Sequence, residues 1–359
     1  MKGKELRIGM VNHFMPELGV KHGGVVQLAH DLAQGMSRRG HEVIVWTYSS
    51  RPEGALYETQ PLPAAGFVRS WLGARLTFGL LGNFFFFLPQ YRDLDVLLLH
   101  GDTALLGLKR PNLVRVMHGS ALGEAFSARN PCRFFVQLII YMQELFSAWL
   151  QPNTIGVSRN STRYNPFVRK WISNGVDTRQ FQADSSKRSS VPSILFVGTF
   201  GGRKRGGWLL EQFKEQVLPK IPEAVLNLVT ETGPEVSGVR YHTGISKEAL
   251  VSLYQECWVY ASPSLYEGFG LPYLEAMASG TPVLATPNPG SIEVTVGGKY
   301  GVLADDMEFA PKLIDLLLRE ELRCEFIKKG LQRAEELSLE QMLDHYEYLF
   351  RNIAEGIKE

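Results

Sequence analysis

The chain has 359 residues, of which 45% are hydrophobic and 21% charged, an ordinary composition for globular protein and enough for two domains. Its 38 basic and 37 acidic side chains give a formal net charge of +1, so nothing in the charge indicates a nucleic-acid partner. Three widely spaced cysteines form neither a disulfide framework nor a zinc motif, and no apolar signal-peptide core follows the basic Met1–Arg7. A cytoplasmic setting is therefore expected.

The first half of the chain alternates strands and helices. Arg7–Val11 (RIGMV) reads as a buried strand, apolar residues recur at helical spacing between Gly24 and Gly40, and His41–Tyr48 reads as the next strand. This order is a βαβ unit, which predicts a parallel sheet covered by helices. Further strands are expected at Asp95–Leu99, Leu113–Met117 and Thr154–Val157, and a long helix at Pro131–Leu150.

A similar series opens at Ser193. Ser193–Gly198 (SILFVG) is a strand that runs into the Gly-rich, basic loop Thr199–Gly207, and a helix follows to about Val217. Further short strands are expected at Ala224–Thr230, Val239–His242, Trp258–Ala261, Pro282–Thr286 and Gly301–Leu303. Two long helices, at about Asp306–Glu336 and Leu339–Ile357, are expected to end the chain.

The boundary between the two series falls in the polar stretch Asn174–Ser190. We therefore predict an α/β protein with two Rossmann-like domains, residues 1–175 and 176–339, and a last helix, 340–359, that packs back onto the first. Doubly wound sheets bind ligands outside the carboxyl ends of their strands. Two such edges that face each other would form one cleft between the domains.

The most informative segment is Ser264–Gly280 (SLYEGFGLPYLEAMASG). Its two loop glycines let the backbone approach a ligand, and Pro272 suits the first turn of a helix. The N-terminus of that helix suits a diphosphate or sugar oxygens. Glu267 and Glu275 lie eight residues apart across the turn and could accept hydrogen bonds from vicinal hydroxyls at two ends of one ligand. The segment thus points to a sugar nucleotide.

The E-x7-E pattern in this segment resembles the signature of retaining glycosyltransferases with the GT-B fold, the group 1 family that includes sucrose synthases and lipopolysaccharide glucosyltransferases. The resemblance covers nearly the whole chain, since other stretches follow the family's order and spacing. These stretches are GGVVQLAHDLAQGMSRRGHEV, VMHGS, NGVDTRQF, FVGTFGGRKRGG and HTGISKEALVSLY.

The resemblance implies a set of donor-binding groups. Glu275 would hold the ribose hydroxyls, and main-chain groups of Ile245 would read the edge of the base. The remaining members would bring backbone groups close to the sugar and the diphosphate: Gly23, Gly24, Phe269, Gly270 and Leu271. The alternative is that the glycines at 23–24 and at 268 and 270 only form turns, and that Ile245 lies in an ordinary loop.

The resemblance also implies catalytic groups. Arg203 and Lys204 would stabilise the departing diphosphate, although Arg205, at a place where glycine is usual, leaves a shift of one residue open. Glu267 would bind the sugar and act electrostatically. His118, at the carboxyl end of a strand, would hydrogen-bond the sugar and help to stabilise an oxocarbenium-like transition state.

Two further motifs concern metals and membranes. The D-x-D at Asp93–Asp95 precedes a strand, where a metal-diphosphate motif would follow one, so neither a metal nor a cofactor is expected. Leu76–Pro89 (LTFGLLGNFFFFLP) spans 14 residues, which is too short to cross a bilayer. It is either a buried helix or an exposed apolar lip that touches the inner face of a membrane or a lipid-linked acceptor.

Taken together, the resemblance implies a retaining, metal-independent hexosyltransferase of polysaccharide biosynthesis. A UDP-sugar is the first expectation for the donor, ahead of GDP and ADP, with glucose as the sugar and a glycan or lipid-linked glycan as the acceptor. A non-catalytic sugar-nucleotide-binding protein and a sugar-nucleotide epimerase of the same fold are the alternatives.

Overall fold

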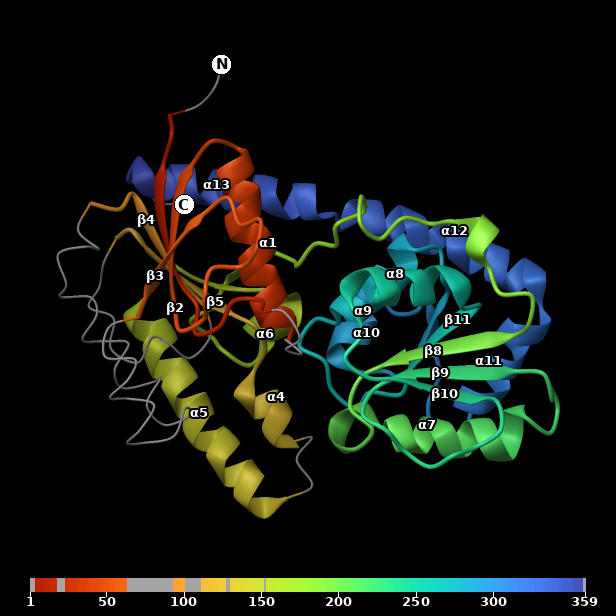
Figure 1. Ribbon diagram of the computed structural model, residues 1–359. Coiled ribbons are helices and arrows are strands. Elements are labelled where there is room, and N and C mark those ends of the chain that lie inside the picture. The colour runs from red at the N-terminus through yellow and green to blue at the C-terminus, as the bar shows by residue number, and fades with distance from the viewer. Residues whose placement is uncertain are drawn as a thin grey trace. The chain divides into compact units, whose positions relative to one another are not determined.

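A computed structural model describes residues 4–17, 23–62, 93–100, 111–126, 130–151 and 153–357. The chain divides into two compact units, shown in Figure 1: unit 1 comprises Met1–Ser173 and Glu340–Glu359, and unit 2 comprises Asn174–Leu339. The boundaries predicted from the sequence fall after residues 175 and 339. The apolar segment Leu76–Pro89, for which a buried helix or an exposed lip was predicted, lies outside the described residues.

Unit 1 is built on a seven-stranded, wholly parallel sheet with the strand order β3-β2-β1-β4-β5-β6-β7. Its strands are β1 (Arg7–Val11), β2 (Glu42–Thr47), β3 (Glu58–Pro61), β4 (Val96–His100), β5 (Leu113–Met117), β6 (Thr154–Gly156) and β7 (Lys170–Trp171). In β1, Ile8 lies between Val43 of β2 and Val96 of β4. The direction of the strand order therefore reverses between β1 and β4, which makes this the topological switch point of the sheet.

Among the described residues, the helices of unit 1 are α1 (Gly24–Arg38), α4 (Ala121–Phe126), α5 (Pro131–Leu150), α6 (Arg159–Arg163) and most of α13 (Leu339–Ala354). The C-terminal helix α13 crosses α1 near one end of that helix (Figure 1), and Leu343 of α13 fills the space next to Gly35 of α1. Arg39, at the end of α1, forms an ion pair with Asp344 at 2.7 Å and another with Glu347 at 3.0 Å. The last helix of the chain therefore completes the first unit.

Unit 2 repeats the same order in a six-stranded parallel sheet, β10-β9-β8-β11-β12-β13. Its strands are β8 (Ser193–Val197), β9 (Val225–Val229), β10 (Val239–His242), β11 (Val259–Ser262), β12 (Val283–Ala285) and β13 (Val302–Leu303). Its helices are α7 (Gly206–Gln212), α8 (Lys247–Glu256), α9 (Leu271–Ala278), α10 (Pro289–Thr295), α11 (Phe309–Leu318) and α12 (Glu320–Glu336). Phe196, Phe213, Leu226 and Phe309 belong to one fully buried core that joins the sheet to its helices.

The structure corrects two sequence predictions. The single helix predicted at Asp306–Glu336 is two helices, α11 and α12, separated by Arg319 in an extended conformation. The guanidinium of Arg323 donates to the carbonyls of Leu316 and Leu317, both at 2.9 Å, so a side chain satisfies the last carbonyls of α11 and the helix can end there. The second correction concerns β3 and β7, which were not predicted because these edge strands carry no buried residues.

Candidate functional site

Two loops of unit 2 meet at the switch point of its sheet. One follows β8 and the other follows β11, and these strands are neighbours, with Val259 opposite Ile194. The backbone N–H of Leu265 donates to the carbonyl of Arg203 at 2.9 Å, which joins the loops directly. Because the carboxyl ends of parallel strands share one edge, segments far apart in the sequence are brought together where such sheets bind ligands.

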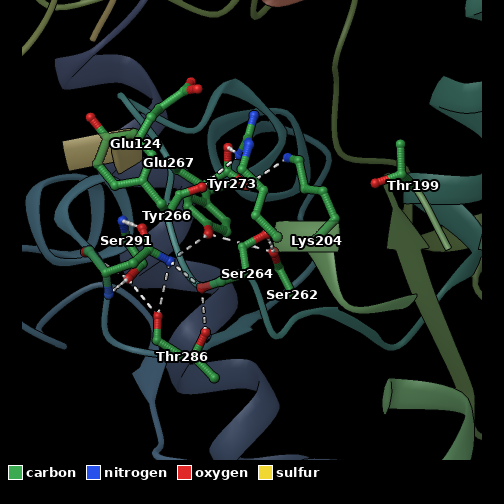
Figure 2. A network of polar contacts seen from close by, with 12 residues as sticks. Glu124, Thr199, Lys204, Ser262, Ser264, Tyr266, Glu267, Tyr273, Thr286 and Ser291 are labelled. Carbon is green, nitrogen blue, oxygen red and sulfur yellow. Dashed lines mark hydrogen bonds and ion pairs between the residues drawn. The ribbon is translucent and has the colours of Figure 1, made fainter. Parts of the chain in front are cut away.

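A buried carboxylate lies at the centre of this junction. Glu267 is only 6% exposed, and its two oxygens pair with Arg203 Nη1 at 3.0 Å and with Lys204 Nζ at 2.6 Å (Figure 2). Burial alone would raise the pKa of Glu267, but the charges of Lys204 and Arg203 outweigh it and hold this pKa below its ordinary value. The carboxyl group is therefore ionised, and two cations against one anion leave the cluster with a net positive charge.

Arg205 takes a different direction from the two residues before it. Its backbone is left-handed, with φ 61° and ψ 37°, and its guanidinium forms a bidentate pair with Asp306 at 2.8 and 2.7 Å. The same guanidinium lies 4.1 Å from the centre of the Trp208 ring. Arg203 and Lys204 thus face Glu267, whereas Arg205 does not contact it. This geometry favours Arg203 and Lys204 as the two cations of the site over the alternative in which the roles are shifted by one residue.

Buried polar side chains support the loop that carries Glu267 through hydrogen bonds to its backbone. The carbonyl of Ser264 accepts from Thr286 Oγ1 at 2.7 Å and from Asn288 Nδ2 at 3.0 Å (Figure 2). Asn288 also caps α10 through a reciprocal pair of hydrogen bonds with Ser291. Sequence reasoning missed these supporting residues, although the spacing of the cap, Asn-Pro-Gly-Ser, is readable at positions 288–291.

The N-terminus of α9 begins directly after this loop. Gly270 caps the helix with φ 100°, a conformation that side chains rarely adopt, and a Cβ there would collide with the ring of Tyr273. Leu271 is the first helical residue and is partly exposed, whereas Phe269 is buried. The positive end of the helix dipole thus lies in the segment that carries Glu267.

Glu275 lies one turn further along α9 and is half-buried. The hydroxyl of Tyr254, on α8, donates to Glu275 Oε2 at 2.9 Å. Burial, followed by the charge of Glu275, raises the pKa of Tyr254 well above its ordinary value, so the phenol keeps its proton and remains a donor. Ile245 is half-buried in the loop before α8, whose first turn is capped by Ser246.

The remaining predicted residues belong to unit 1. His118 follows β5, and its Nε2 lies 3.0 Å from Nδ1 of His100 at the end of β4. Burial lowers the pKa of His118 to about 4, and burial followed by the nearness of His118 lowers that of His100, so both rings are neutral at pH 7. A Cβ on Gly23 would meet nothing within 4 Å, so packing within the chain does not require the glycine before α1.

The structure therefore brings together one group of the predicted residues, all in unit 2: Arg203, Lys204, Glu267, Phe269, Gly270 and Leu271. Among the described residues, no three His, Cys, Asp or Glu side chains gather as a metal would need. Asp95 of the D-x-D sequence accepts from the backbone N–H of Arg7 at 2.8 Å, so it joins two strands. Within the same described ranges, no helix has the length and apolarity to cross a membrane.

Comparison with known proteins gives a consistent result for both units. Residues 191–319 match the family model described as glycosyl transferases group 1, and residues 22–180 match the one described as glycosyltransferase family 4. Sucrose-phosphate synthase from Thermosynechococcus elongatus has a similar structure, with a TM-score of 0.74 at 18% identity over 96% of this chain and 98% of that one. At this identity the likeness shows the fold.

Two sequence relatives differ in how much of their length is matched. Phosphatidyl-myo-inositol mannosyltransferase from Mycobacterium tuberculosis H37Rv is 24% identical over 90% of this chain and 91% of its own length. D-inositol 3-phosphate glycosyltransferase from Corynebacterium urealyticum is 31% identical over 46% of this chain. The match spans only 44% of that second relative.

Proposed function

Because the chain belongs to the group 1 glycosyltransferases and has the GT-B fold, we propose that it transfers a hexose from a nucleotide-diphosphate sugar to a glycan or lipid-linked glycan, with retention of the anomeric configuration. The observation that carries this proposal is the pair of cations, Arg203 and Lys204, held by the buried carboxylate of Glu267 next to the N-terminus of α9.

The donor would lie along unit 2. Its diphosphate would sit at Arg203, Lys204 and the first N–H groups of α9, where both fixed charge and the helix dipole favour an anion. Its ribose would bind Glu275, whose carboxylate is oriented by the proton of Tyr254. The main chain at Ile245 would contact the base, for which UDP is our first choice.

The sugar and the acceptor are proposed on separate grounds. Glucose is our first choice for the sugar, and mannose is the second because one relative is named a mannosyltransferase. The same name gives a phosphatidyl-inositol as that protein's acceptor, which supports a lipid-linked acceptor here. A peripheral contact with the inner membrane face and a cytoplasmic location remain parts of the proposal.

In the proposed reaction, the bond between the anomeric carbon and the diphosphate oxygen breaks while the acceptor oxygen bonds to the same carbon from the same face. The acceptor's proton passes to the departing phosphate. Arg203 and Lys204 would stabilise the charge that develops on the diphosphate. The neutral ring of His118 would hydrogen-bond the sugar. Gly23, where a Cβ would meet nothing within 4 Å, and its neighbour Gly24 would let the backbone of unit 1 approach the ligand.

The contacts of Glu267 bear on the rival path through a covalent glycosyl-enzyme. A carboxylate nucleophile needs a free oxygen aimed at the anomeric carbon. In Glu267, Oε2 pairs with Arg203 and Oε1 with Lys204, and both cations lower its pKa. We therefore assign Glu267 an electrostatic role: it holds the two cations and contacts the sugar.

Four measurements test the proposal. Thermal-shift titration with UDP, GDP, ADP and their glucose and mannose conjugates should give the largest shift with a UDP-sugar, and no shift with UDP would exclude our choice of base. NMR of the product should show the donor's anomeric configuration, and an inverted anomer would refute the retaining assignment. Donor hydrolysis at equal rates in wild type and Lys204→Ala would favour a non-catalytic binding protein, and donor interconversion without an acceptor would favour an epimerase.

A further inference from the structure

Two histidines meet at the carboxyl edge of the sheet in unit 1. His100 is the last residue of β4, and its partner in the neighbouring strand β5 is Val116, two residues before His118. Nδ1 of His100 lies 3.0 Å from Nε2 of His118. A separation of 3.0 Å between two ring nitrogens is that of a direct hydrogen bond, so the strand register brings the two side chains into contact.

The backbone on either side of His118 is held by other groups. The carbonyl of Met117 accepts from the N–H of Val157 at 3.0 Å. The N–H of Ala121, the first residue of α4, donates to both carboxylate oxygens of Glu144, at 3.2 and 3.1 Å. With the main chain fixed at both points, the direction of the imidazole is left to its side-chain torsions. Among the described residues, the bond between the two rings is the only side-chain hydrogen bond of His118, so this bond selects one orientation.

The same bond couples the protonation of the two rings. Burial lowers the pKa of His118 to about 4, and burial followed by the nearness of His118 lowers that of His100, so each neutral ring carries a single N–H. One of these protons must lie between the facing nitrogens, because two bare nitrogens or two N–H groups would repel each other at 3.0 Å. It follows that both rings carry their proton on the same kind of nitrogen, either Nδ1 in both or Nε2 in both.

Only one nitrogen of His118 is left for a ligand. Nε2 is taken by His100, so another group can bind only at Nδ1. The His118 side chain is partly exposed, whereas His100 is 2% exposed and has almost no surface to offer. Through the shared proton, His100 decides whether Nδ1 of His118 donates a hydrogen bond or accepts one.

We propose that His100 is a positioning residue for the sugar contact of His118: it turns Nδ1 of His118 toward the donor sugar and keeps that ring in one neutral tautomer. The inference rests on the proposed function, in which His118 hydrogen-bonds the sugar. A ring that is already oriented loses less conformational entropy on binding and meets a sugar hydroxyl with one defined group. His118 therefore acts through Nδ1 and not through Nε2.

The kinetic test measures kcat/KM for hydrolysis of UDP-glucose, or of the conjugate that gives the largest thermal shift. His100→Phe keeps a ring in the buried site but removes its nitrogens, so kcat/KM should fall about tenfold, the effect of one hydrogen bond. His100→Asn places an amide where Nδ1 lies and should restore kcat/KM to within about threefold of wild type. The matched control is His41→Phe, at a buried histidine whose Nδ1 accepts from the N–H of Leu6 at 3.1 Å. It should lower stability and leave kcat/KM unchanged.

A double-mutant cycle separates positioning from a general effect on folding. In a His118→Ala background, His100→Phe should have no further effect on kcat/KM, because the ring that His100 orients is gone. A further loss in that background would overturn the positioning role. If His118→Ala lowered kcat/KM and His100→Phe did not, the positioning role would fail and the proposed function would stand. If His118→Ala had no effect, the sugar contact in the proposed function would itself be wrong.

NMR of the ring nitrogens reads the tautomers without any measurement of activity. In protein with isotope-labelled histidine, the two rings are assigned by the loss of their signals in His100→Phe and His118→Ala. At pH 7 both wild-type rings should be neutral and carry the proton on the same kind of nitrogen, and His118 should become a mixture of tautomers in His100→Phe. Opposite tautomers in the two wild-type rings, a mixture in wild-type His118, or a charged ring would overturn the proposal even if His100→Phe did not fold.

Discussion

Replacing Lys204 with alanine removes one of the two cations that pair with Glu267. Its ammonium lies 2.6 Å from Glu267 Oε1 and is mostly buried, so it is already fixed before any ligand binds. A cation about 4 Å from a developing negative charge contributes on the order of 4 kcal/mol at the effective dielectric constant of such sites. We therefore expect Lys204→Ala to lower kcat by about 10²–10³, the usual loss when one preorganised electrostatic contact is removed.

The matched control is Arg205→Gly, which removes the same charge one residue further along. The Arg205 guanidinium contacts Asp306 and Trp208, and glycine adopts the left-handed backbone of this position without strain. Asp306 is more than half exposed but Arg205 is only 8% exposed, so loss of the pair and of the packing on Trp208 should lower the free energy of unfolding by roughly 1–3 kcal/mol, which urea titration would measure. We expect kcat within about threefold of wild type, because the Arg205 guanidinium contacts Asp306 and Trp208 and not Glu267.

The assay is the initial rate of sugar transfer at saturating donor, with donor affinity measured separately by thermal shift. If Arg205→Gly lowered kcat as much as Lys204→Ala, the assignment of the cations would be shifted by one residue. If neither variant lowered it, the positive cluster at Glu267 would have no part in the chemistry.

Three further predictions follow from the same geometry. Gly270→Ala should lower the free energy of unfolding by roughly 1–3 kcal/mol in urea titration and weaken donor binding, because φ is 100° and a Cβ would strike Tyr273; unchanged stability would contradict this. Tyr254→Phe should weaken donor binding about tenfold or less with kcat nearly unchanged, because one hydrogen bond to Glu275 is lost; a loss confined to kcat would argue against a ribose contact. The pKa of His118 falls from 6.5 to about 4 on folding, so the stability that the neutral ring contributes should be complete above pH 6.5 and decline by about 1.4 kcal/mol per pH unit between pH 6.5 and 4. Urea titrations at pH 7.5 and 5 should therefore show a smaller loss of unfolding free energy for His118→Gln than for wild type. An equal loss in both proteins would refute the assignment.

The elements that the sequence predicts best are those whose residues are buried in a uniform way. The bounds predicted for Arg7–Val11 and Leu113–Met117 are those of β1 and β5. Central strands of a parallel sheet are covered on both faces and so read as unbroken apolar runs. The two-residue strand β7 lacks such a run and was not predicted.

Local sequence patterns could not predict the contacts between loops that lie far apart in the chain. The sequence indicates that Arg203, Lys204 and Glu267 each suit a charged ligand, but their mutual pairing depends on β8 lying next to β11, which only the strand order decides. For the same reason, nothing local showed that Asn288 would support the loop of Glu267 from the next strand along.

Periodicity has a similar limit in α5. The spacing of Ile139, Met142 and Phe146 shows that these residues share one side of a helix, and such a side normally faces the core. The hydrogen bonds of Tyr141 and Glu144 to segments before and after the helix reverse that expectation. Which side of a helix is buried is therefore a property of its partners as well as of its own sequence.

The return of α13 to unit 1 has a consequence for the order in which the chain folds during its synthesis. Unit 2 is one uninterrupted stretch, so it is complete as soon as residue 339 has left the ribosome. Unit 1 must wait for the final helix, whose Leu343 covers Gly35 and whose Tyr346 and Phe350 are fully buried. Domains commonly fold in the order in which they are made. Here we expect the second domain to finish first, while the side of α1 that α13 will cover is still open to chaperones.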